Sequence, residues 1–231
     1  MMFDPLWLIL SLPGMALSLW ASFNVKRTFE RYSRVRSSRG LSGAEAAREL
    51  IRRRGVEGVT VEETPGFLSD HYDPGERVLR LSPDVYHGRS LASLGVAAHE
   101  AGHAIQHARG YGPLRFRSMV VKPAMIGSNL ALPIAGLGMM LHSVGLMWVG
   151  VVLFSAFVVF TLVTLPVEFD ASRRAVIALE EEGIISHAEA GDAGAVLRAA
   201  AMTYVAAAVS AVLQLLYFLI RSGLLSSRRE D

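Results

Sequence analysis

Apolar residues gather in four long blocks along the chain, with polar stretches between them. The blocks cover residues 1–23, 119–142, 145–167 and 199–220. Each is close to the roughly 20 residues that a helix needs to cross the hydrocarbon core of a bilayer. The pattern therefore predicts a mainly α, multi-pass membrane protein.

The first block has the features of an uncleaved anchor. Trp7 and Trp20 lie near its two ends, where indole rings favour the membrane interface, and it lacks the basic start and the cleavage site of a signal peptide. A run of basic residues from Lys26 to Arg39 follows. By the positive-inside rule, the N-terminus lies outside and the segment after the block lies in the cytoplasm.

The second and third blocks are predicted to form a helical hairpin, because only a very short link joins them. Gly127, Ala131 and Ala135 recur at every fourth position of the second block. Such spacing allows another helix to approach closely inside a membrane.

The last block leaves two alternatives open. A full span would place Arg221, Arg228 and Arg229 outside, and these three charges count against it. A re-entrant or interfacial segment is the alternative.

A polar region with a short helix is predicted after the first block. The stretch from Ser42 to Glu45 is a capping-box pattern, and the helix that it opens ends at Gly55. Three arginines, 52–54, stand at the end of this helix. We interpret them as complementing the helix dipole and the anionic headgroups of lipids.

Two short strands are predicted next, at 59–63 and 77–81, with a turn-rich stretch at 64–75 between them. Together they suggest a small β-hairpin on the cytoplasmic side. Within the turn-rich stretch, Asp70 and Asp73 are expected to stabilise turns. The second strand could also offer a free edge for an extended peptide.

The composition of the chain limits its possible partners and metal ligands. A formal net charge of +2 is too small to suggest a nucleic acid as a partner. The chain has no cysteine. Any metal site must therefore use His, Asp or Glu side chains.

The stretch at 96–105 reads Val-Ala-Ala-His-Glu-Ala-Gly-His-Ala-Ile and is predicted to lie on a helix from about Ser90 to Arg109. His99 and His103 are one helical turn apart, roughly 6 Å along the axis, so both imidazoles can bind one zinc ion. Glu100 follows the first histidine directly and can act as general base on a zinc-activated water.

A catalytic zinc usually takes three protein ligands, and three residues compete for the third place. His107 lies roughly 12 Å along the helix axis from His99, and no glycine turns the chain between His103 and His107, so it is disfavoured. Glu168 and Asp170 both remain. An acid such as Glu168 at a membrane boundary costs free energy unless it has a partner.

Several separated motifs together resemble the YugP-type membrane zinc metallopeptidases, and the resemblance covers essentially the whole chain. The motifs lie at 68–74, 81–86, 90–98, 99–106 and 168–172. The last of them is also similar to the E-x-x-A-D block of the HtpX and CAAX-prenyl-protease class of gluzincins.

The resemblance implies a zincin-like helical catalytic core that holds Zn²⁺ with His99, His103 and Glu168. It also implies that Glu100 is the general base. The implied function is a membrane-embedded endopeptidase that hydrolyses peptide bonds of membrane or membrane-associated proteins. Its partners would be a protein or peptide substrate and the lipid bilayer, with no nucleic acid.

The chain departs from the wider class at one position, where Ser172 stands in place of an aspartate. Asp170 or Ser172 is therefore expected to orient a zinc-bound histidine. A donor to the oxyanion is also expected, and His71 and Tyr72 are candidates for it.

Two rival functions compete with this one. An intramembrane-cleaving protease is disfavoured, because predicted strands precede the motif helix and Arg109, Arg115 and Arg117 follow it. A non-catalytic zinc-binding membrane adaptor is the alternative, although the intact Glu100 argues against it.

The predicted organisation places the catalytic residues on one side of the bilayer, because the hairpin returns the chain to the side that it left. The protein is expected in the cell membrane, with its active site on the cytoplasmic side. The segments are an N-terminal transmembrane anchor at 1–23, a cytoplasmic catalytic region at 24–118, a transmembrane helical hairpin at 119–167, cytoplasmic helices with the third zinc ligand at 168–198, and a C-terminal membrane segment with its tail at 199–231.

Overall fold

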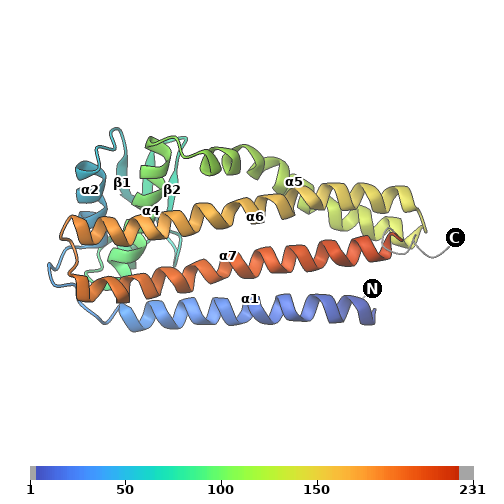
Figure 1. Cartoon of the computed structure of the whole chain (residues 1–231), viewed down its shortest axis with the longest axis horizontal. Coiled ribbons are helices and arrows are strands. Elements are labelled where there is room, and N and C mark those ends of the chain that lie inside the picture. The colour runs from blue at the N-terminus through green and yellow to red at the C-terminus, as the bar shows by residue number, and fades with distance from the viewer. Residues whose placement is uncertain (1–3, 224–231) are drawn as a thin grey trace. The chain divides into compact units, whose positions relative to one another are not determined.

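Helices make up most of the computed structural model, which describes residues 4–223 (Figure 1). The mainly α prediction is confirmed. Residues 1–3 of the first apolar block, and the tail with Arg228 and Arg229, lie outside the described residues. In chain order the elements are α1 (Pro5–Tyr32), α2 (Gly43–Arg53), β1 (Thr60–Glu63), β2 (His71–Asp73), β3 (Val78–Leu81), α3 (Pro83–Tyr86), α4 (Leu91–Ala108), α5 (Gly112–Met140), α6 (Val144–Glu181) and α7 (His187–Arg221).

The chain divides into two compact units. The first, here called the apolar unit, comprises the described parts of Met1–Trp20, Arg115–Pro166 and Thr203–Asp231. The second, called the motif unit because it contains residues 96–105, comprises Ala21–Leu114 and Val167–Met202. Helices α1, α5, α6 and α7 each contribute residues to both units.

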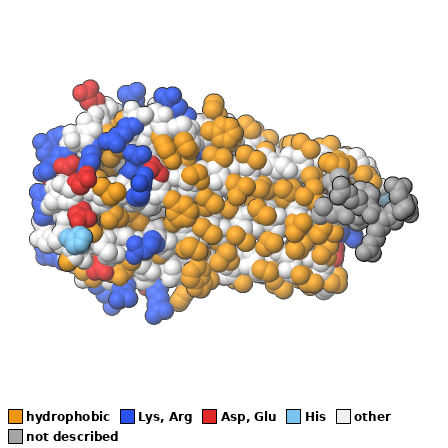
Figure 2. All heavy atoms as spheres, viewed as in Figure 1, with side chains coloured by type: hydrophobic (Ala, Val, Ile, Leu, Met, Phe, Trp, Pro, Cys, Tyr) orange, Lys and Arg blue, Asp and Glu red, His pale blue; other side chains and the backbone are white. Residues whose placement is uncertain are grey.

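The apolar unit is built from helices with apolar outer faces. Most described residues of each predicted block lie on one of four helices that are long and apolar enough to cross a membrane. Hydrophobic side chains cover the visible surface of this unit, whereas Lys and Arg side chains gather on the motif unit (Figure 2). Large side chains such as Leu132 and Val152 are about half exposed or more, at 52% and 63%. Such surfaces suit a lipid solvent and not water.

Small residues bring α5 and α6 together within the apolar unit, as the four-residue spacing predicts. Ala131 and Ala135 are buried. A Cβ atom on Gly127 would stand only 2.8 Å from the carbonyl oxygen of Leu153, so the two backbones are in close contact there. The predicted hairpin is confirmed, because α5 ends at Met140 and α6 begins at Val144.

The start of α1 and the end of α7 also meet within the apolar unit. The hydroxyl of Tyr217 donates a hydrogen bond to Oδ2 of Asp4 at 3.0 Å, and Nε of Arg221 lies 3.6 Å from the same oxygen. Arg221 therefore has a carboxylate partner, which weakens the charge argument against a full fourth span. Helix α7 is continuous over 35 residues.

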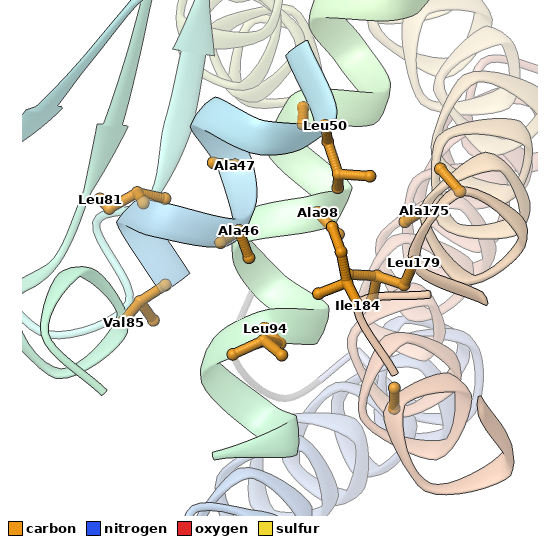
Figure 3. Close-up of a cluster of buried hydrophobic side chains, with 14 of the residues drawn as sticks. Ala46, Ala47, Leu50, Leu81, Val85, Leu94, Ala98, Ala175, Leu179 and Ile184 are labelled. Atoms are coloured by element: carbon orange, nitrogen blue, oxygen red, sulfur yellow. The ribbon is translucent and has the colours of Figure 1, made fainter. Parts of the chain in front are cut away.

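The core of the motif unit forms where α2 and α4 pack together with parts of α6 and α7. The capping box predicted for α2 is present, because Oγ of Ser42 accepts from the Glu45 amide and the Glu45 carboxylate accepts from the Ser42 amide. Figure 3 shows the apolar side chains that meet beside α4. Burying one leucine side chain contributes about 1.5–3 kcal/mol. The fully buried apolar side chains of this core include Leu50, Leu94, Leu179 and Ile184.

The pairing of the sheet differs from the prediction. Strand β3 is central, with β1 parallel to it on one side and β2 antiparallel on the other. The predicted hairpin of 59–63 with 77–81 is therefore wrong, and so is the free edge at 78–81. The reason is the tight turn after β2, where Asp73 accepts from the amides of Gly75 and Glu76 and so places β2 beside β3. The expected turn role of Asp73 is confirmed.

Two of the three arginines at the end of α2 have carboxylate partners. Arg53 forms ion pairs with Glu49 and Glu182, and Arg54 forms ion pairs with Glu181 and Glu182. These two side chains therefore hold α2 against the end of α6. Arg52 and Arg53 lie in the last turn of α2, where they complement the helix dipole, and the role toward lipid headgroups stays a prediction.

Candidate metal centre

Helix α4 carries the His-Glu-x-x-His sequence and has the predicted limits. Oγ of Ser90 accepts from the Ser93 amide at its start, and Gly110 follows its end with a φ of +63°. A left-handed residue at this place is a common helix stop, and glycine adopts it without strain. His99 and His103 lie on the same face, with ring centroids 4.7 Å apart.

Helix α6 brings Glu168 to this face of α4. This helix runs without a break through Pro166 and carries Glu168 beyond it. Gly102 makes the contact close, because a Cβ atom there would stand 2.8 Å from the carbonyl oxygen of Ala171 on α6. A side chain at position 102 would force the two backbones apart.

The structure brings the three predicted ligands together. Oε2 of Glu168 lies 3.1 Å from Nε2 of His99 and 3.6 Å from Nε2 of His103. The candidate ligand atoms all lie within 4.8 Å of one another. The spacing fits zinc, because tetrahedral ligands at about 2.0–2.1 Å from the ion are about 3.3 Å apart. The side chains are 13%, 9% and 2% exposed for His99, His103 and Glu168, so the cluster is largely shielded from water.

Hydrogen bonds on the far side of His103 fix its tautomer. The side-chain amide nitrogen of Gln106 donates to the carbonyl oxygen of Val167 and to Oδ2 of Asp170, both at 2.9 Å. A carbonyl and a carboxylate only accept, so Oε1 of Gln106 must face His103. That oxygen is 3.0 Å from Nδ1 of His103. Nδ1 therefore carries a proton, which leaves Nε2, on the Glu168 side, as the candidate ligand atom.

His99 is held in the same orientation by a different residue. Its Nδ1 lies 3.1 Å from Oγ of Ser172. Its Nε2 faces Glu168, as in His103. Partners of this kind orient metal-binding imidazoles and raise their affinity for the ion. The support expected from Asp170 or Ser172 is present from both residues, with Asp170 acting through Gln106.

Two comparisons with known proteins bear on this cluster. The family model described as "Putative neutral zinc metallopeptidase" matches residues 7–223. The chain is also 46% identical over 216 residues to the "Putative membrane protease YugP" of Bacillus subtilis (strain 168), across 93% of this chain and 96% of that protein. The chain belongs to this family of zinc metallopeptidases. No solved structure matches it.

Membership confirms the resemblance drawn from the motifs, and zinc is the cofactor that it implies. The donor set of the cluster suits that ion, with two imidazole nitrogens and one carboxylate oxygen in a buried position. The relative is named a membrane protease, and four helices here are long enough to span. The protein is therefore a membrane protein.

Glu100, between the two histidines in the sequence, is also buried, with 8% of its surface exposed. Burial alone lowers the pKa of His103, but hydrogen bonding to Glu168 and the nearby charge of Glu100 raise it above its ordinary value. Burial raises the pKa of Asp70, and the charge of Glu100 raises it further, against hydrogen bonds from Ser82. Glu100 therefore lies close enough to both His103 and Asp70 to influence their protonation.

The other candidates have different partners. Nδ1 of His107 lies 2.8 Å from the hydroxyl of Tyr72, so His107 joins α4 to β2 and takes no part in the three-residue cluster. Nδ1 of His71 lies 2.8 Å from the carbonyl oxygen of Ser69. The role of Tyr72 or His71 as an oxyanion donor stays a prediction.

Gln106 was missed by the sequence interpretation, although a signal for it existed. It stands three residues after His103, a spacing that places two side chains on the same helix face. Its importance depends on Asp170, which is 64 residues away in the sequence. The role of Gln106 can therefore be recognised only when α4 is seen packed against α6.

Proposed function

We propose that this chain is a zinc-dependent endopeptidase that hydrolyses peptide bonds of membrane or membrane-associated proteins. His99, His103 and Glu168 hold the metal, and Glu100 is the general base. The single observation that carries the proposal is the buried cluster in which both Nε2 atoms face the Glu168 carboxylate. The family and the named relative support the same reaction class.

The residues around the cluster have distinct tasks in this reaction. Zinc held by His99, His103 and Glu168 would lower the pKa of a bound water to about 7 and would polarise the scissile carbonyl. The Glu100 carboxylate accepts the proton of the attacking water and then gives it to the leaving amine. Ser172 and Gln106 keep the two imidazoles in the ligand orientation. Burial of Glu100 limits competition from bulk water for its proton.

The proposed side of the membrane follows from charge. The basic residues between Lys26 and Arg39 come directly after the first apolar block. The positive-inside rule assigns such a segment to the cytoplasm, and all members of the cluster belong to the same motif unit as that segment. The active site therefore faces the cytoplasm.

A pair of variants tests the peptidase against a non-catalytic zinc adaptor. Glu100→Gln should retain the metal, because Glu100 lies outside the ligand set, but should lower the cleavage rate by about 10² to 10⁴. His103→Ala should lose metal and activity together. Zinc content by elemental analysis and cleavage of a membrane-protein substrate in proteoliposomes give the two readings.

The result that decides against the proposal is a zinc-loaded Glu100→Gln variant that cleaves at the wild-type rate. In that case the base is another residue or the hydrolysis belongs to a contaminant. If the wild-type protein binds zinc but cleaves none of the peptides derived from the proteins of its own membrane, the non-catalytic zinc adaptor is the better function.

A further inference from the structure

A cavity separate from the metal cluster lies between α1 and α7 in the motif unit. Its volume is about 290 Å³. One wall is the last part of α1 and the other is the first half of α7. Its polar lining comes from Asn24, Thr28, Arg31, Tyr32 and Arg198.

The cavity carries positive charge without a balancing acid. Two arginines line it, and none of its lining residues is Asp or Glu. Within the described chain, neither arginine forms an ion pair with a carboxylate. The contact of Arg198 is a long one, 3.4 Å, to the carbonyl oxygen of Gly191, and the guanidinium of Arg31 lies over the ring of Tyr32 at 5.3 Å.

The two cavity arginines differ in this respect from seven arginines elsewhere in the motif unit, which bind carboxylates. Those with such a partner include Arg39, Arg53, Arg54, Arg80, Arg89, Arg173 and Arg174. The neutral donors of the cavity are also unused by the protein, since no hydrogen bond of the Asn24 or Thr28 side chain occurs within residues 4–223. The cavity therefore offers two cations and several donors to a ligand.

The place of the cavity on each helix indicates the kind of ligand. Asn24 directly follows the first apolar block, which ends at Phe23. On α7, Ala199 and Met202 line the cavity and stand at the start of the last apolar block. Both walls thus lie where a helix changes from polar to apolar, which is the level of lipid headgroups for a spanning helix.

We propose that this cavity binds the headgroup of an anionic glycerophospholipid. Arg31 and Arg198 bind the phosphate by charge-assisted hydrogen bonds, which suit a guanidinium. Asn24 and Thr28 donate to the glycerol oxygens. A zwitterionic choline lipid is disfavoured, because the cavity has no acid to receive its ammonium group. The site is independent of the proposed peptidase reaction.

Native mass spectrometry of the zinc-loaded, full-length protein in detergent tests the site. Phosphatidylglycerol is titrated against wild type, Arg31→Gln and Arg198→Gln, with phosphatidylcholine as the comparison lipid. Each loss of charge should weaken phosphatidylglycerol binding about fivefold or more, which corresponds to the usual contribution of one basic residue at an anionic lipid surface. Arg198→Lys keeps a charge and should fall between wild type and Arg198→Gln.

Arg52→Gln is the matched control. Arg52 is exposed, belongs to the same unit and lies outside the cavity. Its removal lowers the net charge equally and should leave binding unchanged. Zinc content should stay the same in every variant, which separates this result from failure of the metal site or of the fold.

Three results would overturn the proposal. Equal weakening by Arg52→Gln would mean general attraction to negative charge. Equal binding of phosphatidylcholine would remove the anionic preference. Displacement of the lipid by glycerol phosphate at the same concentration would indicate a site for a soluble phosphate instead.

Discussion

Gln106 determines which nitrogen of His103 faces the proposed metal position. Its substitution therefore tests directly how the orientation of this imidazole affects zinc affinity. Gln106→Leu removes the acceptor for Nδ1 of His103 and one of the donors to Asp170. Loss of such an outer partner typically costs 10- to 100-fold in metal affinity. Competition with a zinc-binding dye measures that loss.

A double variant distinguishes the loss of the Gln106 hydrogen bonds from a general change in packing around His103. Gln106→Glu alone puts a carboxylate beside Asp170, so zinc binding should also fall. Combining it with Asp170→Asn restores a donor for the new carboxylate, which can still accept from Nδ1 of His103. Affinity should then recover toward wild type. Equal affinity for Gln106→Leu and wild type would contradict the assigned role.

Asp70 links the loop before β2 to the start of α3, because its Oδ1 accepts from the Ser82 amide at 2.8 Å. Its pKa is raised in the folded protein, first by burial. Its contribution to stability is therefore complete below the unfolded pKa of about 3.9 and is lost as the pH rises through the folded value. Asp70→Asn keeps an acceptor oxygen and has no charge to bury.

The Asp70→Asn variant should thus have a higher Tm than wild type at neutral pH, with the difference shrinking as the pH falls to about 4. Thermal unfolding of the metal-free protein in detergent, followed by intrinsic fluorescence, gives both values. A difference that grows on acidification would show that the ionised carboxylate stabilises the fold.

At the scale of elements, the contact of α4 with α6 assembles the cluster. Gly102→Ala would place a Cβ 2.8 Å from the Ala171 carbonyl oxygen. Overpacking of this kind usually costs about 1–3 kcal/mol. The backbones must separate, so zinc affinity and Tm should both fall, as chelator competition and thermal unfolding would measure.

Gly95→Ala is the comparison on the same helix. Its Cβ would meet Ala193 at an ordinary 3.5 Å. Replacing glycine with alanine inside a helix typically contributes about 0.5–1 kcal/mol. This variant should therefore gain stability and retain zinc. If both substitutions change Tm and zinc affinity in the same way, the close approach of α4 and α6 at position 102 is not what assembles the metal site.

Elements whose signals are local could be predicted from the sequence, and those that depend on distant partners could not. The capping box of α2 and the limits of α4 were predicted correctly, because caps and glycine stops act within a few residues. The His99 and His103 pair follows from helix periodicity alone. The pairing of β1 with β3 and the relay from Gln106 to Asp170 depend on packing between separated segments.

At the scale of the whole molecule, the contact between the start of α1 and the end of α7 constrains the membrane topology. Asp4 at the start of α1 binds Tyr217 and Arg221 at the end of α7. If α1 crosses the membrane with its N-terminus outside, the end of α7 must lie outside as well. The four helices then account for four full spans, and the motif unit remains cytoplasmic.

Single cysteines in this cysteine-free chain provide the test. Leu141→Cys places a thiol in the exposed link between α5 and α6, and Glu57→Cys places one in an exposed loop of the motif unit. An impermeant thiol reagent on intact cells should label position 141 and leave position 57 unlabelled until the cells are opened. The reverse pattern would place the motif unit outside, because both thiols are exposed and differ only in the side of the bilayer that they occupy.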